Sequence, residues 1–225
     1  RARTFDLVSL LISLLMVIGL ASWFLWPIAA AYWDERNAWR ASSPNSKASS
    51  LQLVGSLNNA DPTTRLHAIE SLVRIGAPAV PDLVDALEGN APNVRSLAAV
   101  ALGRIGPAAE PAVDALCSAL ESDEKDFVIG VLLAIQRIGL KSDDHIAAVA
   151  GVVNQDDSDV RNLAIDTLSL SGSAAIPALT NALQHEDLSL RVRAAIYLTQ
   201  IDPDEPSILA VLLDDLKKHG FETAA

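Results

Sequence analysis

The stretch that decides the fold is RLHAIESLVRIG, residues 65–76, because its pattern returns four times further along the chain. The related strings are RSLAAVALGRIG at 95–106, VIGVLLAIQRIG at 128–139, RNLAIDTLSLSG at 161–172 and RVRAAIYLTQID at 191–202. All five align without gaps, and their starts are separated by 30, 33, 33 and 30 residues. Self-similarity at such a period is typical of solenoids, in which each repeat packs only on its neighbours.

Two columns of this alignment have the spacing of one helical face. The fourth position holds a small residue and the eighth a large aliphatic one, so both side chains point to the same side of a helix. The small column contains Ala68, Ala98, Val131, Ala164 and Ala194, and the aliphatic column contains Leu72, Leu102, Ile135, Leu168 and Leu198. A small residue lets the next helix approach, and the large one fills the space beside it. The strings therefore predict closely stacked helices.

Turn and cap residues divide each repeat into two helices. Glycines end the pattern, where a residue in the left-handed αL conformation commonly closes a helix; they are Gly76, Gly106, Gly139 and Gly172. Prolines then open the next helix, since a missing N–H does no harm in a first turn; they are Pro81, Pro111 and Pro177. Asp61, Asp157 and Asp187 stand where N-caps of the first helices are expected. Each unit is thus predicted to be helix, tight turn, helix.

The pattern predicts about five helix pairs. First helices are expected near 62–75, 92–105, 125–138, 158–171 and 188–201, and second helices near 79–88, 108–121, 143–154, 174–185 and 205–218. Residues 49–59 add a half-repeat that can cap the start of the stack. Terminal repeats of a solenoid are atypical because one face meets water, and Asp202-Pro203 replaces the glycine turn in the last unit.

These residues resemble the short HEAT-like repeats of the phycobilisome-lyase type over roughly 61–202. The shared pattern is an acidic cap, an Arg, Ala and Leu on one face, an Ile-Gly turn and a Pro opening the second helix. The resemblance implies an all-α protein with an α-α superhelical solenoid, and a role among scaffolds, adaptors, assembly factors or bilin lyases. The third repeat departs, with Val128 for Arg and Asp144 for Pro, so we expect less regular geometry there.

The first residues predict a membrane anchor. No charged side chain occurs from Leu7 to Trp33, and such a helix is about 40 Å long, enough to cross a hydrocarbon core of about 30 Å. Aromatic residues at its carboxyl end predict an interfacial belt, made of Trp23, Trp26, Tyr32, Trp33 and Trp39. A cleaved signal peptide is the alternative, but its apolar core is usually shorter. We expect an anchor at 1–40, a flexible Ser-rich linker at 41–50 and the solenoid at 51–225.

Charge favours protein partners over nucleic acid. The net charge is −11, and residues 49–225 hold twenty-five of the 28 acidic side chains but only twelve of the 17 basic ones. Such a surface repels phosphate backbones. Carboxylates of the second helices are the candidate partner-binding surface, because second helices line the concave side of such solenoids; they are Asp82, Asp85, Glu110, Asp114, Asp143, Asp144, Asp214 and Asp215. The other interpretation is a solvated face that keeps an Ala-rich array soluble.

No motif predicts catalysis, a metal or a cofactor. The histidines lack ligand spacing, and Cys117 stands between Leu116 and Leu120 as a small apolar residue without a base beside it. The stretch 154–159 resembles a calcium loop but lacks its glycine and its glutamate, so a turn capped by Asp157 explains it better. The repeated arginines (Arg65, Arg95, Arg161 and Arg191) are interpreted as partners of carboxylates in neighbouring repeats.

The sequence therefore predicts a non-enzymatic, single-pass membrane protein whose solenoid binds other proteins. We expect an accessory or assembly subunit of an integral-membrane complex, with integral-membrane subunits and lipid as partners. The charges Arg1, Arg3, Asp34 and Glu35 around the apolar run favour an extracytoplasmic solenoid. The alternatives are a chaperone or bilin-lyase-like enzyme, which the resemblance implies, and a secreted repeat protein.

Overall fold

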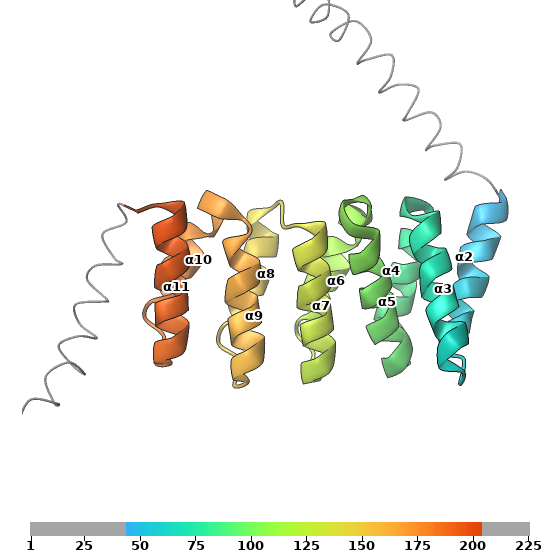
Figure 1. The fold of residues 1–225 in the computed structure, drawn as a ribbon, viewed down its shortest axis with the longest axis horizontal. Coiled ribbons are helices and arrows are strands. Elements are labelled where there is room, and N and C mark those ends of the chain that lie inside the picture. The colour runs from blue at the N-terminus through green and yellow to red at the C-terminus, as the bar shows by residue number, and fades with distance from the viewer. Residues whose placement is uncertain (1–43, 204–225) are drawn as a thin grey trace, which may run out of the picture. The chain divides into compact units, whose positions relative to one another are not determined.

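The computed structural model describes residues 44–203, and every element in this range is helical. Figure 1 shows the helices standing side by side in chain order. The α-helices are α2 Pro44–Ser56, α3 Pro62–Ile75, α4 Val80–Glu88, α5 Pro92–Ile105, α6 Val113–Ala119, α7 Lys125–Ile138, α8 Asp143–Val152, α9 Ser158–Ser169, α10 Ile176–Ala182 and α11 Leu188–Ile201. Short 3₁₀ helices η1 Ala77–Ala79, η2 Gly106–Ala112 and η3 Gly172–Ala175 join some of them. The predicted all-α solenoid is confirmed.

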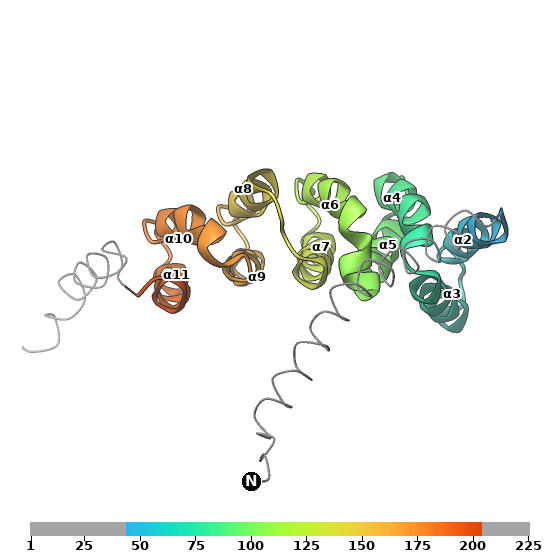
Figure 2. The same cartoon turned by 90° about the horizontal axis from the view of Figure 1, so that it is seen from above.

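The helices form two rows. Helices α3, α5, α7, α9 and α11 make the first-helix row, and α4, α6, α8 and α10 make the second-helix row, as Figure 2 shows from above. Four of the five predicted first helices have the expected bounds, and α9 ends two residues before its predicted end at 171. The last predicted second helix, near 205–218, lies outside the described residues.

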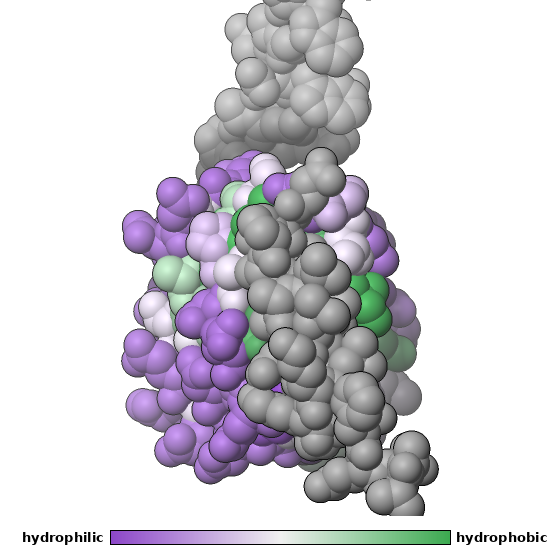
Figure 3. Space-filling view, turned by 90° about the vertical axis from the view of Figure 1, so that its left-hand side faces the viewer, coloured by the Kyte–Doolittle hydropathy of each residue, from purple (hydrophilic) through white to green (hydrophobic). Residues whose placement is uncertain are grey.

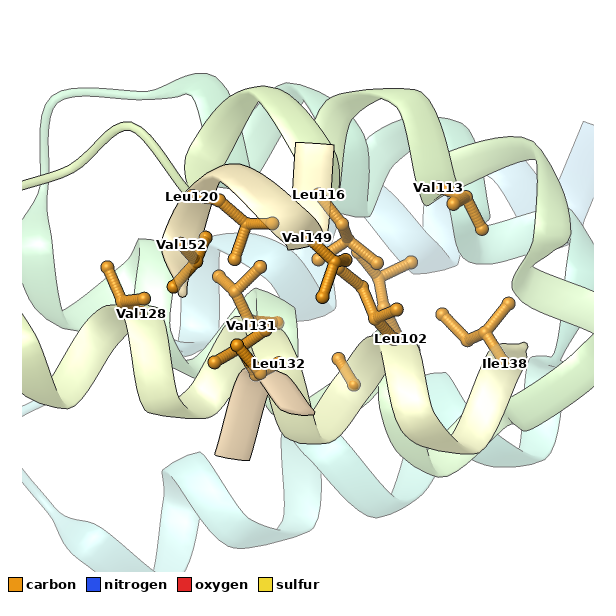
Figure 4. Close-up of a cluster of buried hydrophobic side chains, with 14 of the residues drawn as sticks. Leu102, Val113, Leu116, Leu120, Val128, Val131, Leu132, Ile138, Val149 and Val152 are labelled. Atoms are coloured by element: carbon orange, nitrogen blue, oxygen red, sulfur yellow. The ribbon is translucent and has the colours of Figure 1, made fainter. Parts of the chain in front are cut away.

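The core lies between the two rows. Leu102 of α5, Leu116 of α6, Val131 of α7 and Val149 of α8 point toward one another in Figure 4, and each is fully buried or nearly so. Both predicted columns are buried along the described array, from Ala68 and Leu72 onward. Stacking therefore produces one continuous apolar core, as expected when no single repeat can bury its own apolar face.

The turns between first and second helices explain the repeated glycines. Gly76 and Gly106 have φ of 74° and 72°, with ψ of −138° and −143°. These values have the predicted positive φ, but they lie outside the αL region, which has positive ψ. The backbone thus adopts an extended, mirror-image conformation that only glycine reaches without strain. The amide of Gly76 still donates to the carbonyl of Leu72, which closes α3.

Side-chain caps begin the helices where the sequence predicted them. Asp61 and Asp157 each accept hydrogen bonds from the backbone amides two and three residues further on, and Asp187 accepts from the amide of Ser189. Asp157 caps α9, so residues 154–157 form an inter-repeat turn and 158–159 begin the helix. Pro81 lies in the first turn of α4, whereas Pro111 lies inside η2, and α6 begins after it at Val113. A proline ring fixes φ but is compatible with the tighter 3₁₀ turn.

Two segments differ from the simplest repeat pattern. Helix α2 begins at Pro44, inside the stretch 41–50 that was predicted to be a flexible linker. Ser50 on this helix is buried and donates to the Asp82 carboxylate, a contact between distant residues that local composition does not reveal. The third repeat has no 3₁₀ helix in its turn; Ser142 caps α8, and Asp144 in the first turn stands where the other repeats have a proline.

The predicted anchor is not tested by this structure. Within residues 44–203, no helix combines the length and the hydropathy needed to cross a bilayer. The apolar run from Leu7 to Trp33 and its aromatic belt (Trp23, Trp26, Tyr32, Trp33 and Trp39) lie outside the described residues.

Candidate interaction surfaces

Basic residues at the start of the first helices hold neighbouring repeats together. The guanidinium of Arg161 donates to the carbonyls of Gln155 and Asp156 at 2.9 and 2.6 Å, and to the carboxylate of Asp187 at 2.7 Å. Asp187 is the N-cap of the next first helix, α11. One side chain therefore fixes the loop before its own helix and the cap of the following one. The predicted pairing across repeats is confirmed for Arg161.

In the two preceding repeats, too, a basic side chain of one first helix contacts the N-cap residue of the next first helix; we call this contact a link. Arg95 lies 3.9 Å from a carboxylate oxygen of Glu124, the N-cap of α7, and 4.2 Å from the centre of the Phe127 ring. Lys125 contacts the α9 cap Asp157 at 2.8 Å. Lys125 stands three positions before Val128, on the same helical face, so it takes the place of the missing arginine. The sequence interpretation missed this substitution.

Arg65 holds the loop before its own helix but, among the described residues, makes no link to the next first helix. Its guanidinium donates to the carbonyls of Asn59 and Ala60 at 2.8 and 3.0 Å. The next first helix, α5, has Ala91 as its N-cap, so this repeat offers no carboxylate at the corresponding place. Asp61, the N-cap of the same helix, accepts hydrogen bonds from Thr63 and Thr64, which hold the pKa of Asp61 well below its usual value.

The predicted acidic surface is divided among three environments. Asp82 is buried and accepts from Ser50. Glu110 and Asp114 are exposed but paired with the next repeat, at 2.5 Å from Lys141 Nζ and 2.7 Å from His145 Nε2. The carboxylates of Asp85, Asp143 and Asp144 are exposed on α4 and α8. Asp214 and Asp215 lie outside the described residues.

A pocket with both polar and apolar lining lies on the first-helix row near its end. It measures about 450 Å³ and is lined by residues of α7, α9 and α11, among them Gln136, Asp166 and Tyr197. Asp166 accepts from Tyr197 Oη and from Arg193, both at 2.8 Å. Partial burial and the nearby carboxylate raise the pKa of Tyr197. The repeat alignment did not single out these residues, because Asp166 shares its column with Val100 and Leu133.

The described residues contain no group of three or more histidine, cysteine or acidic side chains able to hold a metal ion. His145 contacts the carboxylate of Asp114 in the preceding repeat, and His185 accepts from the backbone amide of Asp187. Cys117 is half-buried, and burial raises the pKa of its thiol to about 11, with a smaller contribution from Asp114. A thiol with this pKa is protonated at neutral pH, so it is a poor nucleophile.

The two rows differ in their exposed apolar side chains. Among the described residues, eight large apolar side chains are exposed. Seven of them lie on or directly beside the first-helix row: Leu66, Val100, Leu133, Leu170, Leu188, Val192 and Ile196. Figure 3 looks along the array from the α11 end and shows a hydrophilic surface with a small apolar patch on one flank.

Comparison with known proteins identifies the fold. Residues 51–136 match the family model of HEAT repeats, and no curated protein matches the chain in sequence. The complex of CpcE and CpcF of phycocyanin lyase from Nostoc sp. PCC7120 is similar in structure, with 21% identity over 73% of this chain and 69% of that one and a TM-score of 0.51.

Two artificial proteins are similar as well. An engineered protein shares 22% identity over 77% of this chain and 90% of its own, with a TM-score of 0.51. A designed armadillo repeat protein in complex with the peptide (KR)4 shares 15% identity over 77% of this chain and 92% of its own, with a TM-score of 0.53. Identities this low establish a common fold only. The described chain is therefore an α-solenoid with the HEAT-repeat fold.

Proposed function

We propose that this protein is a non-catalytic scaffold that binds other proteins beside a membrane, as an accessory or assembly subunit of an integral-membrane complex. The observation that carries the proposal is the stacked array, in which the links from Arg95, Lys125 and Arg161 hold successive repeats in register. An array of this kind presents a long, fixed surface whose outward side chains the packing does not use. Solenoids bind partner proteins along such surfaces.

The membrane part of the proposal rests on the uncharged run from Leu7 to Trp33. A tether of this kind confines the solenoid to the membrane surface and raises its effective concentration near membrane partners. The second-helix row is the proposed site for a basic partner segment, because Asp85, Asp143 and Asp144 are exposed there. The fold shared with a designed protein that holds the (KR)4 peptide supports this use of the array.

Co-purification and extraction test the two parts separately. The full chain, tagged at its carboxyl end, is isolated from its native membranes in mild detergent and its partners are identified by mass spectrometry. We expect integral-membrane subunits in stoichiometric amounts, and retention of the chain in membranes washed at alkaline pH. Recovery of the chain alone would refute the scaffold. Release of the chain by the wash, with its partners left in the membrane, would refute the anchor and leave the scaffold intact.

A bilin lyase is the second candidate, favoured by the fold shared with CpcE and CpcF. The assay is incubation of the full chain with a bilin and an acceptor protein, followed by absorption spectroscopy. Pigment attachment to the acceptor that depends on the chain would establish the enzyme and replace the scaffold proposal. Failure to bind pigment would exclude the lyase.

A further inference from the structure

The first-helix row exposes large apolar side chains, whereas the second-helix row exposes none among the described residues. Exposed residues of α4, α6, α8 and α10 are only proline, aspartate, glutamate, serine, alanine, glycine and asparagine. The remaining exposed large apolar residue of the described chain is Leu51, on α2. Apolar side chains gathered on one face mark an interaction surface more often than scattered ones do. The first-helix row is therefore the better candidate for an apolar contact.

A groove runs between two helices of this row. It measures about 140 Å³, and its walls include Val100 of α5 and Leu133 of α7, which are 40% and 43% exposed. Its floor contains Gly103 and Gly130 together with alanines, and the exposed surface of its lining is mostly apolar. Because the floor residues are so small, the backbone of a docking segment could approach α5 and α7 closely.

Arg137 lines one end of this groove, and Arg104 follows the wall residue Val100 by one helical turn. Arg104 and Arg137 are exposed in the last turns of α5 and α7, next to the glycine turns, and neither pairs with a carboxylate among the described residues. They also complement the partial negative charge at their own helix ends. In contrast to the linking residues Arg95 and Arg161, their guanidinium groups are free to meet an incoming acidic group. The groove is thus apolar along its length and basic at one end.

We propose that this groove binds an amphipathic, acidic helix of a partner protein. Its apolar side chains, spaced three and four residues apart, would lie against Val100 and Leu133, and its carboxylates would meet Arg104 and Arg137 at the end near the glycine turns. A flat bilayer would not enter a groove floored by Gly103, so a protein helix fits better than lipid. This inference rests on the proposed scaffold function and adds the surface and the partner's chemistry.

Binding of a synthetic helical peptide to the full chain tests the chemistry. The probe has leucines at helical spacing and two glutamates at one end, and a second probe has lysines in their place. We expect R104E/R137E to weaken the glutamate peptide about tenfold and to strengthen the lysine peptide, because exposed charges set such preferences. L133D should also weaken the glutamate peptide, whereas L51D, which changes an exposed leucine on α2, should not.

Equal binding of both peptides by the unaltered chain, or no binding of the glutamate peptide, would overturn the inference. So would binding of anionic phosphatidylglycerol vesicles that R104E/R137E abolishes while glutamate-peptide binding is unchanged, since the surface would then be a lipid contact. Circular dichroism of each variant establishes that the helices remain folded.

Photo-cross-linking separates this inference from the scaffold proposal. A benzophenone side chain is placed in the full chain at Leu133 on the first-helix row, or at Ala147, which is exposed on α8. We expect cross-links from position 133 to an acidic, apolar segment, and their loss in R104E/R137E. Cross-links from position 147 alone would overturn the groove and keep the scaffold. Absence of protein cross-links from both would overturn the two proposals together.

Discussion

Replacing Gly103 by alanine should weaken the contact between α5 and α7, although alanine is the better helix former. A Cβ atom at position 103 would lie 2.8 Å from the Cα and 3.1 Å from the Cβ of Ala134. The Cα belongs to the backbone of α7, so no side-chain rotation can relieve the overlap. The third repeat must move away from the second, and the apolar contacts between them must loosen.

The magnitude follows from two opposing effects. Alanine in place of a helical glycine stabilises by about 0.5–1 kcal/mol, whereas overpacking of a close contact costs about 1–3 kcal/mol. For Gly103→Ala we expect a net loss of about 0.5–2 kcal/mol in the free energy of unfolding. Gly130→Ala is the matched control, because this glycine lies on the facing helix and an added Cβ would meet nothing within 4 Å. It should gain about 0.5–1 kcal/mol.

Urea unfolding of the full chain, followed by far-UV circular dichroism, measures both variants. Solenoids can unfold in more than one step, so the midpoint and the steepness of the transition should be compared together. Gly103→Ala should unfold at lower urea than the unaltered chain, and Gly130→Ala at higher urea. If Gly103→Ala proved as stable as Gly130→Ala, the close approach of α5 and α7 would not exist in solution.

Three other predictions concern the links and the thiol. Arg161→Lys should destabilise the array by about 1–3 kcal/mol, because a single ammonium cannot serve two carbonyls and a carboxylate; an unchanged urea midpoint would contradict this. Lys125 lowers the pKa of Asp157, and Arg161 lowers the pKa of Asp187. The stability that these two carboxylates contribute is therefore present above the pKa of an unfolded aspartate, about 3.9, and is lost as the pH falls toward their lower pKa values in the folded chain. Denaturation from pH 7 to 3 should show that loss, less steeply in Asp187→Asn. Cys117, with a pKa near 11, should react with a maleimide at pH 8 about a hundredfold more slowly than an unstructured cysteine, and a rate equal to that of a short cysteine peptide would refute its burial.

The helices were predictable because their signals are local. Apolar spacing and the glycine, proline and aspartate positions are read within a few residues, so the bounds of α3 and α5 follow directly from the repeats. Contacts across repeats were not predictable in this way. Gly103 shares its column with Val73 and Gln136, so no repeated signal marks the close approach to Ala134.

The candidate acidic surface was predicted only in outline. Placement of the carboxylates on the second-helix row followed from the repeat period, and the structure agrees for Asp82, Asp85, Asp114, Asp143 and Asp144, whereas Glu110 lies in η2 before α6 begins. The repeat period did not predict which of these carboxylates are free to bind a partner protein, because that depends on contacts with residues far away in the chain. Asp82 meets Ser50, and Asp114 meets His145 of the next repeat. The paired carboxylates, Glu110 and Asp114, each have a lysine or histidine 31 residues further along the chain. That spacing of about one repeat is the sequence signal that could have revealed the pairing.

Arginines at the two ends of the first helices have different roles, one in holding the fold and one in the proposed binding of a partner. Those that begin the first helices, such as Arg161, bind loop carbonyls and the next N-cap, so the packing of the array occupies them. Those that end the helices, such as Arg104 and Arg137, stand beside glycine turns that offer no carboxylate. The net charge of −11 therefore conceals a row that exposes most of the large apolar side chains and carries Arg104 and Arg137 beside its glycine turns, because a solenoid separates its two faces while composition averages them. A partner chosen from net charge would be basic, whereas the groove between α5 and α7 selects an acidic one.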